Sequence, residues 1–80
     1  MNTNLESINF IYSFRKNNHQ EVRAFFNDFH GCEMAHIRVF EIGGLYQFPT
    51  TKGISVVATQ LHELKRAVDA LVSAQEGNLQ

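Results

Sequence analysis

Four side chains that commonly bind metals lie within seven positions of the chain, at His30, Cys32, Glu33 and His36. Zinc prefers histidine and cysteine ligands, so this spacing suggests a zinc site. In an extended strand, however, Cys32 and His36 share one face while Glu33 points to the other, and the chain has no second cysteine. A Cys32–His nucleophile pair also lacks an identifiable orienting acid. We therefore expect no metal, no cofactor and no catalytic residue, and we predict that the protein is not an enzyme.

The composition indicates one small globular domain over residues 1–80, with its core at about 8–76. Of the 80 residues, 44 % are hydrophobic and 19 % are charged, with seven phenylalanines and two tyrosines. The net charge of −1 provides no bulk positive field, although nucleic-acid binding requires only a local basic face. The single cysteine excludes internal disulfides, and MNTNLES does not have the basic and apolar regions of a secretory signal. We expect an intracellular protein without a membrane-spanning segment.

Alternation of apolar and polar residues predicts an antiparallel meander of four strands. A polar turn is expected at 16–20, a tight turn at His30-Gly31, and a loop at 43–51. The predicted strands cover 8–15, 21–29, 33–42 and 53–58.

Alternation assigns the side chains of the first and third predicted strands to opposite faces of the sheet. In the first strand, we expect Ile8, Phe10, Tyr12 and Phe14 to share one face. In the third strand, Ile37 points to one side of the sheet and Arg38 to the other.

The last part of the chain predicts one amphipathic helix, with Thr59 as its N-cap, an end near residue 75 and Gly77 as the stop signal. Its apolar residues and flanking alanines cover an arc of roughly 160°, which is wider than the ~100° needed to contact one sheet. We therefore predict an α+β fold, a four-stranded sheet followed by a C-terminal helix, that forms a homodimer through this helix. The alternative is a helix packed deeply into the curvature of its own sheet. The predicted interface residues are Leu61, Leu64, Val68, Leu71 and Val72.

A lysine-glycine pair heads the fourth predicted strand and belongs to a longer ordered pattern. The pattern comprises Asp28, Phe29 and Gly31; Ile37, Arg38 and Phe40; Lys52, Gly53, Ile54 and Ser55; and Leu64 and Lys65. In this order and spacing, about residues 22–75 resemble the single-stranded-DNA-binding domain of the transcriptional positive cofactor four family.

Several positions depart from the pattern of that family. His30 and Cys32 replace hairpin lysines, Thr51 replaces the basic residue before Lys52, and Glu41 stands where an aromatic stacking residue is expected. A short bacteriophage or bacterial member of the family would have such features.

The resemblance implies a homodimer that binds unpaired strands, with cations along the phosphates and aromatic faces under the bases. Lys52 would be the main phosphate cation, Gly53 would allow a close backbone approach to the strand, and Arg38 would face the nucleic acid if Ile37 faces the helix. Without the resemblance, Lys52 is an ordinary solvated charge. The further residues expected on the surface are Arg15, Lys16, Arg23, Phe25, Phe29, His30, Tyr46 and Phe48.

Some of these residues have structural alternatives. Phe25 or Phe29 could equally belong to the core, and Arg15-Lys16 could be an ordinary charged turn.

Two classes of function follow from these observations. The first is a homodimeric single-stranded DNA-binding protein with little sequence preference that acts in DNA replication, recombination, repair or transcription. It would be associated with DNA inside the cell, or in the cytoplasm of a bacterial host if it is viral, and would meet replication or transcription proteins there. The alternative is a dimeric protein-interaction module that recruits such partners without binding DNA. That module would show no salt-sensitive retention on single strands.

Overall fold

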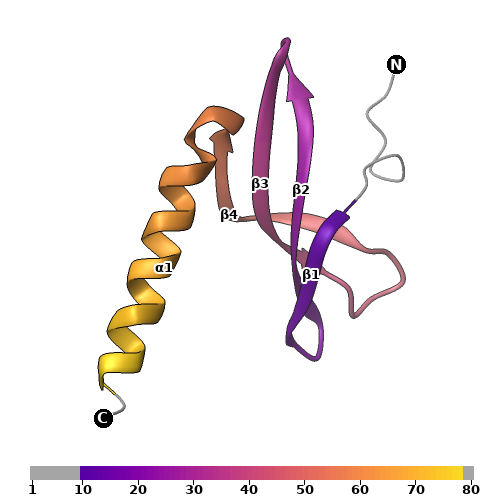
Figure 1. The fold of residues 1–80 in the computed structure, drawn as a ribbon. Helices are drawn as coiled ribbons and strands as arrows, with labels where there is room; N and C mark the ends of the chain where they lie inside the picture. The colour runs from indigo at the N-terminus through magenta and orange to yellow at the C-terminus, as the bar shows by residue number, and fades with distance from the viewer. Residues whose placement is uncertain (1–9, 79–80) are drawn as a thin grey trace.

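The structure is a computed structural model that describes residues 10–78 of the chain (Figure 1). Four strands form one antiparallel sheet in the order β1-β2-β3-β4, and a short 3-10 turn then leads into a C-terminal helix. This confirms the predicted α+β meander. The elements are β1 (Phe10–Asn17), β2 (Gln20–Phe29), β3 (Cys32–Glu41), β4 (Phe48–Val57), η2 (Ala58–Gln60) and α1 (Leu61–Asn78).

The β2–β3 hairpin is the longest regular unit of the sheet, with unbroken pairing from Gln20–Glu41 to Phe29–Cys32. Its turn has φ 54° at His30 and φ 79° at Gly31. Positive φ at both central residues is the type I′ geometry, whose twist matches that of the flanking strands. The tight turn predicted at these two residues is confirmed.

Alternation along this hairpin defines two faces of the sheet. We call the first the Arg38 face and the second the helix face, because Ile37 lies with residues of α1 around one groove. The Arg38 face carries Arg23, Phe25, Asn27, Phe29, His36, Arg38 and Phe40, and the helix face carries Ala24, Phe26, Ala35, Ile37 and Val39.

A bulge in β1 changes the predicted face of one aromatic residue. Phe10 pairs with Phe25, whereas Tyr12 pairs with Ala24, so one extra residue interrupts the alternation. Phe10 therefore lies on the Arg38 face, and the prediction that it shares a face with Tyr12 and Phe14 is wrong. Ile8, the fourth residue predicted there, lies outside the described residues.

β4 bends sharply along its length, as Figure 1 shows. The ladder pairs Arg38 with Gly53, and three residues of β4, 50–52, then lie opposite the single residue Val39. Gly53 has φ 143°, and a Cβ atom there would lie 2.4 Å from the carbonyl oxygen of Ile37. Only glycine fits this close approach of β4 to β3.

Several element boundaries differ from the prediction. β1 runs to Asn17 and β2 starts at Gln20, so the first turn is shorter than the predicted 16–20. β4 starts at Phe48 rather than at residue 53, because an edge strand tolerates Pro49 within it. Thr59 lies inside η2 instead of capping α1, which begins at Leu61. Gly77 lies within α1, where glycine costs only about 1 kcal/mol relative to alanine.

The helix meets the rest of the chain only near its first turns. Leu61 and Leu64 are half-buried, whereas residues 65–77 are exposed. Figure 1 shows α1 beside the sheet rather than sunk into it. The alternative of a helix packed deeply into its own sheet is therefore wrong. Among the described residues, no helix is long and apolar enough to cross a membrane.

The core is small and divided between the two faces. Phe25 and Phe40 are buried on the Arg38 face, and Ala35 and Val39 are buried on the helix face. Such a small core is expected for so short a chain. The apolar residues of α1 beyond Leu64 remain exposed.

Candidate nucleic-acid interface

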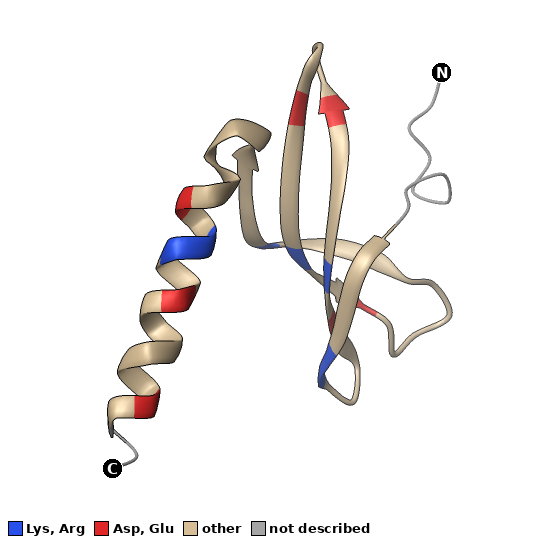
Figure 2. Cartoon of the chain, viewed as in Figure 1, with Lys and Arg blue, Asp and Glu red and all other residues tan. Residues whose placement is uncertain are grey.

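Two arginines lie side by side on β2 and β3, and a lysine follows them at the bend of β4. Arg23 is directly opposite Arg38, and Arg38 is opposite Gly53, the neighbour of Lys52. Figure 2 shows basic positions about the middle of the sheet and acidic ones near the tip of the β2–β3 hairpin. Like charges directly opposite each other repel unless a negative charge compensates them.

Arg38 is held in place by neutral partners. Its Nη2 donates to Ser55 Oγ at 2.7 Å, and its Nη1 points to the carbonyl oxygen of Thr50 at 3.4 Å. No carboxylate of the described residues lies within ion-pair distance of it. A guanidinium carries five N–H donors in a rigid fork. Arg38 is therefore an oriented cation with free donors and no acidic partner among these residues.

Arg23 is packed into the fold instead. Its guanidinium carbon lies 4.8 Å from the ring centroid of Phe10 and 4.6 Å from that of Phe40. Nε donates to Glu21 at 2.7 Å and Nη2 donates to Gln47 at 2.8 Å. With its side chain only 11 % exposed, the expectation of an open cation is wrong. Arg23 therefore joins the β3–β4 loop, through Gln47, to the rings of Phe10 and Phe40.

The two candidate stacking residues of β2 differ in exposure. Phe25 is 7 % exposed, with its ring edge-on to Phe10 and stacked on His36 at 4.9 Å. It belongs to the core and offers no free ring face, which corrects its expected stacking role. Phe29 is 61 % exposed at the end of β2, with its ring edge against His30 at 4.3 Å. Phe29 and His30 therefore form the open aromatic end of the Arg38 face.

The remaining predicted residues lie at the edges of the sheet, and one of them lies off this surface. Arg15 and Lys16 are exposed at the end of β1, and Tyr46 is 78 % exposed in the β3–β4 loop. Phe48 pairs with Glu41 and so lies on the helix face, away from Arg38, which is a further correction.

Lys52 is exposed at the bend of β4, where its backbone N–H donates to Thr50 Oγ1 at 3.1 Å. Among the described residues, no partner of its ammonium fixes the side chain in one direction. The backbone of the neighbouring Gly53 closely approaches β3. The expected close approach of Gly53 to the nucleic acid is therefore not what requires glycine at this position.

A hydrogen-bonded row on this surface was missed by sequence reasoning. His36 Nδ1 lies 2.7 Å from Ser55 Oγ, and His36 Nε2 lies 2.7 Å from Asn27 Oδ1. The sequence offered one indication of this row: His36 stands two residues before Arg38 and so shares its face of β3. The partnership with Ser55 depends on the register of β4. In the part of the chain that the structure describes, no three metal-binding side chains gather at one point.

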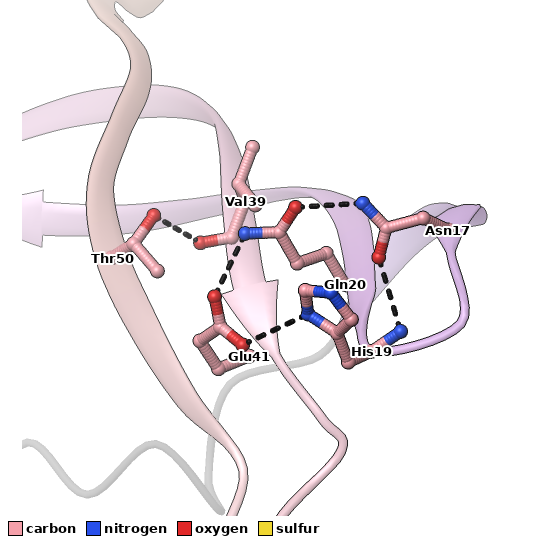
Figure 3. A network of polar contacts seen from close by, with 6 residues as sticks. All are labelled: Asn17, His19, Gln20, Val39, Glu41 and Thr50. Atoms are coloured by element: carbon pink, nitrogen blue, oxygen red, sulfur yellow. Dashed lines mark hydrogen bonds and ion pairs between the residues drawn. The ribbon is translucent and has the colours of Figure 1, made fainter.

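A second polar network closes the opposite end of the sheet (Figure 3). Gln20, which is buried, donates from Nε2 to Glu41 at 2.7 Å, and His19 Nδ1 lies 3.5 Å from the same carboxylate. The hydrogen bond from Gln20 is the largest cause that lowers the pKa of Glu41. Glu41, at a position where the resemblance would place a stacking aromatic, is therefore a structural carboxylate that joins β3 to the β1–β2 turn.

Comparisons with known proteins agree with this architecture. The structure is similar to two crystal forms of a PC4 homologue from Burkholderia pseudomallei, where PC4 denotes positive cofactor four. The tetragonal form has a TM-score of 0.71 and 22 % identity, over 84 % of this chain and 98 % of that chain. The orthorhombic form has a TM-score of 0.72 and 21 % identity, over 89 % and 95 %. No protein-family profile and no curated protein matches the sequence. The chain shares the fold of this PC4 homologue, in agreement with the resemblance in sequence.

Proposed function

We propose that the protein is a non-enzymatic homodimer that binds single-stranded DNA on the Arg38 face with little sequence preference. The observation that supports this most is the arginine itself. Arg38 is oriented by Ser55 and Thr50 and adjoins Arg23 and Lys52, with no acidic partner of its own among the described residues. A phosphate would supply the missing negative charge.

The distribution of charge explains how a chain of net charge −1 can present a basic surface. In β1, β2 and β3, the arginines share one face, where the single carboxylate is already paired with Arg23. The other acidic residues of these strands lie on the helix face. The arginines are Arg15, Arg23 and Arg38, the paired carboxylate is Glu21, and the helix-face acids are Asp28, Glu33 and Glu41.

Unpaired DNA suits this surface better than duplex DNA. The open ring of Phe29 can stack only on an accessible base, and such stacking is tolerant of sequence. Duplex recognition commonly places a basic helix in the major groove. In α1, however, Lys65 pairs with Asp69 at 2.8 Å, and Arg66 lies 3.8 Å from Glu63. The helix therefore presents no uncompensated basic face.

The second copy in the proposed dimer packs against α1. A groove of about 460 Å³ lies between the start of α1 and Ile37 on the helix face. Its walls include Leu61, Leu64 and Val68, and the apolar row continues beyond it through the exposed Leu71. Because helices in proteins are stabilised mostly by packing of their apolar face, the exposed apolar row of α1 favours a partner. A twofold arrangement lets each helix enter the other's groove.

In this proposal, the protein acts on unpaired strands inside the cell, in replication, recombination, repair or transcription. The cell is bacterial, and the protein is encoded by the bacterium or by a bacteriophage. The competing proposal is a dimer that recruits replication or transcription proteins through the exposed β3–β4 loop without binding DNA. Leu45 and Tyr46, which are 96 % and 78 % exposed, favour such a contact. Recruitment through this loop is also compatible with DNA binding on the Arg38 face.

Fluorescence anisotropy with a single-stranded oligonucleotide and its duplex, across a salt series, tests the proposal. The single strand should bind more tightly, and its affinity should fall steeply as salt rises because bound phosphates release counterions. Arg38→Ala should weaken binding and reduce the salt slope by about 0.7, the increment for one charge on a single strand. Arg66→Ala removes the same charge from α1 and should change neither quantity.

Lys52→Ala in the same titration tests the role of the junction lysine. A loss of affinity with a similar reduction in slope would support a phosphate contact, whereas unchanged binding would make Lys52 a solvated surface charge. Equal affinity for blunt duplex, or no binding of either form at low salt, would reject the proposed function. Absence of salt-sensitive binding would then favour the recruitment module.

A further inference from the structure

A continuous row of hydrogen bonds crosses the Arg38 face from β4 to β2. Arg38 Nη2 donates to Ser55 Oγ at 2.7 Å, and Ser55 Oγ lies 2.7 Å from His36 Nδ1. On its other side, His36 Nε2 lies 2.7 Å from Asn27 Oδ1. Both ring nitrogens of His36 are thus occupied, and its ring is stacked on Phe25.

The direction of these bonds assigns the proton on His36. Asn27 Oδ1 is an amide oxygen and can only accept, so Nε2 must donate to it. Ser55 Oγ accepts from Arg38, which leaves its hydroxyl hydrogen free to be donated to Nδ1. The row is therefore complete when His36 is neutral and carries its proton on Nε2.

The surroundings of His36 also favour its neutral form. Burial, followed by the charge of Arg38, lowers its pKa below the ordinary value of 6.5. Lys52 stands at the bend of β4, and His30 at the tip of the hairpin. From residue 53 onward, β4 adds only Gly53, Ser55 and Val57 to this face, none of them charged. The other titratable or charged side chains on the face are Arg15 on β1, Glu21 and Arg23 on β2, and Cys32 and Arg38 on β3.

We propose that His36 takes up one proton from solvent when single-stranded DNA binds and so becomes a second cation for the phosphate held by Arg38. This inference rests on the proposed function and adds a pH dependence to the same surface. A phosphodiester at Arg38 cancels the repulsion that opposes a charge on His36 and adds an attractive negative charge beside it.

The row can reverse without moving the backbone. Once Nδ1 is protonated, it donates to Ser55 Oγ, and the serine no longer needs to donate to the ring. Its hydroxyl hydrogen can then turn to a phosphate oxygen beside Arg38. Asn27 still accepts from Nε2, so every polar group of the row remains paired.

The sign of the pH effect follows from linkage. Since the pKa of His36 is lowered in the free protein and raised in the complex, binding takes up a proton between these two values. The dissociation constant should fall as the pH decreases through that window, by at most about tenfold per pH unit. Outside the window, the contribution of His36 should be constant.

Nuclear magnetic resonance of the histidine imidazoles tests this on the wild-type chain. The probe is oligothymidylate, whose bases do not titrate near neutral pH, and the titration covers roughly pH 5 to 8. The His36 signal, identified by its loss in His36→Gln, should titrate below 6.5 in the free protein. It should shift upward by about one unit with saturating oligonucleotide, which corresponds to about tenfold tighter binding in acid.

Fluorescence anisotropy with the same probe compares the pH dependence of binding in two matched histidine variants. His36→Gln should remove most of the pH dependence of binding. His19→Gln removes a histidine from the β1–β2 turn, outside the row and the Arg38 face, and should retain that dependence. If His36→Gln fails to fold, the His36 signal is assigned instead by its proximity to the ring of Phe25, and the wild-type titration decides.

The outcomes separate the inference from the proposed function. Binding of oligothymidylate with an unmoved or lowered His36 pKa would overturn the inference and leave the function standing. Absence of binding at every pH and at low salt would overturn both.

Discussion

At the residue scale, two phenylalanines four positions apart on one face of β2 have different roles because of what surrounds them. Phe25 is enclosed by Phe10, Phe40 and His36, whereas Phe29 lies beyond this cluster at the end of the hairpin. The two arginines of this face differ in the same way, according to their neighbours. Arg23 is compensated by Glu21, while Arg38 has only neutral partners among the described residues.

Substituting each phenylalanine by alanine should separate stability from binding. Phe25→Ala removes a buried ring and should destabilise the fold by about 3–5 kcal/mol. Phe29→Ala should leave the melting temperature nearly unchanged and weaken single-strand binding by roughly 1–3 kcal/mol, with the salt slope retained. One thermal melt and one titration for each variant measure both effects. A large loss of stability in Phe29→Ala would place that ring in the core and remove it from the proposed surface.

At the scale of elements, the bend of β4 positions the proposed binding surface. The three residues 50–52 pass opposite Val39, and the ladder resumes at Gly53. This shift brings Ser55 opposite His36 and leaves Lys52 at the bend. A regular β4 would pair different side chains with β3 and would break the row between Arg38 and Asn27.

Gly53→Ala tests that bend. The added methyl group would meet the backbone of Ile37 at φ 143°, where side chains are strained. We expect a loss of stability of about 1–3 kcal/mol or more in urea unfolding, together with weaker single-strand binding. Gly44→Ala is the matched control, because its Cβ would meet nothing within 4 Å, and its stability should change by no more than about 0.5 kcal/mol. Wild-type stability of Gly53→Ala would show that β4 can straighten at no cost.

At the scale of the whole molecule, the described residues leave α1 and the helix face only partly covered. Val68, Leu71 and Val72 are 46 %, 72 % and 44 % exposed. Burying this row in a second copy would also set two Arg38 faces on one particle. A dimer could then hold two segments of one strand, which raises the effective concentration of the second contact.

Light scattering should therefore show a dimer at micromolar concentration. Val68→Asp places a charge within the apolar row and should yield a monomer or an unfolded chain, because burial of an unpaired carboxylate is costly. Ser73→Asp, on the opposite side of α1, is the control and should remain dimeric. A wild-type chain that is monomeric and fully folded would contradict the proposed interface.

Local patterns in the sequence were sufficient for the order of the elements. Alternation with period two marks the strands, and the His30-Gly31 turn and the spacing of apolar residues mark the hairpin and helix. They also placed Ile37 and Arg38 on opposite faces of β3, because alternation is a property of the single strand. The width of the apolar row on α1 pointed in the same way to a missing partner for the helix.

Only the tertiary structure decided the details of the site, because these depend on which residues pair across strands. The bulge after Phe10 and the three extra residues of β4 break the period of two, and neither is visible in one strand read alone. Neighbours from other strands bury Phe25 and Arg23, and the shifted register of β4 sets Ser55 between His36 and Arg38. Residue type and spacing determine a face of a strand, but contacts between strands determine which side chains of that face remain open to a ligand.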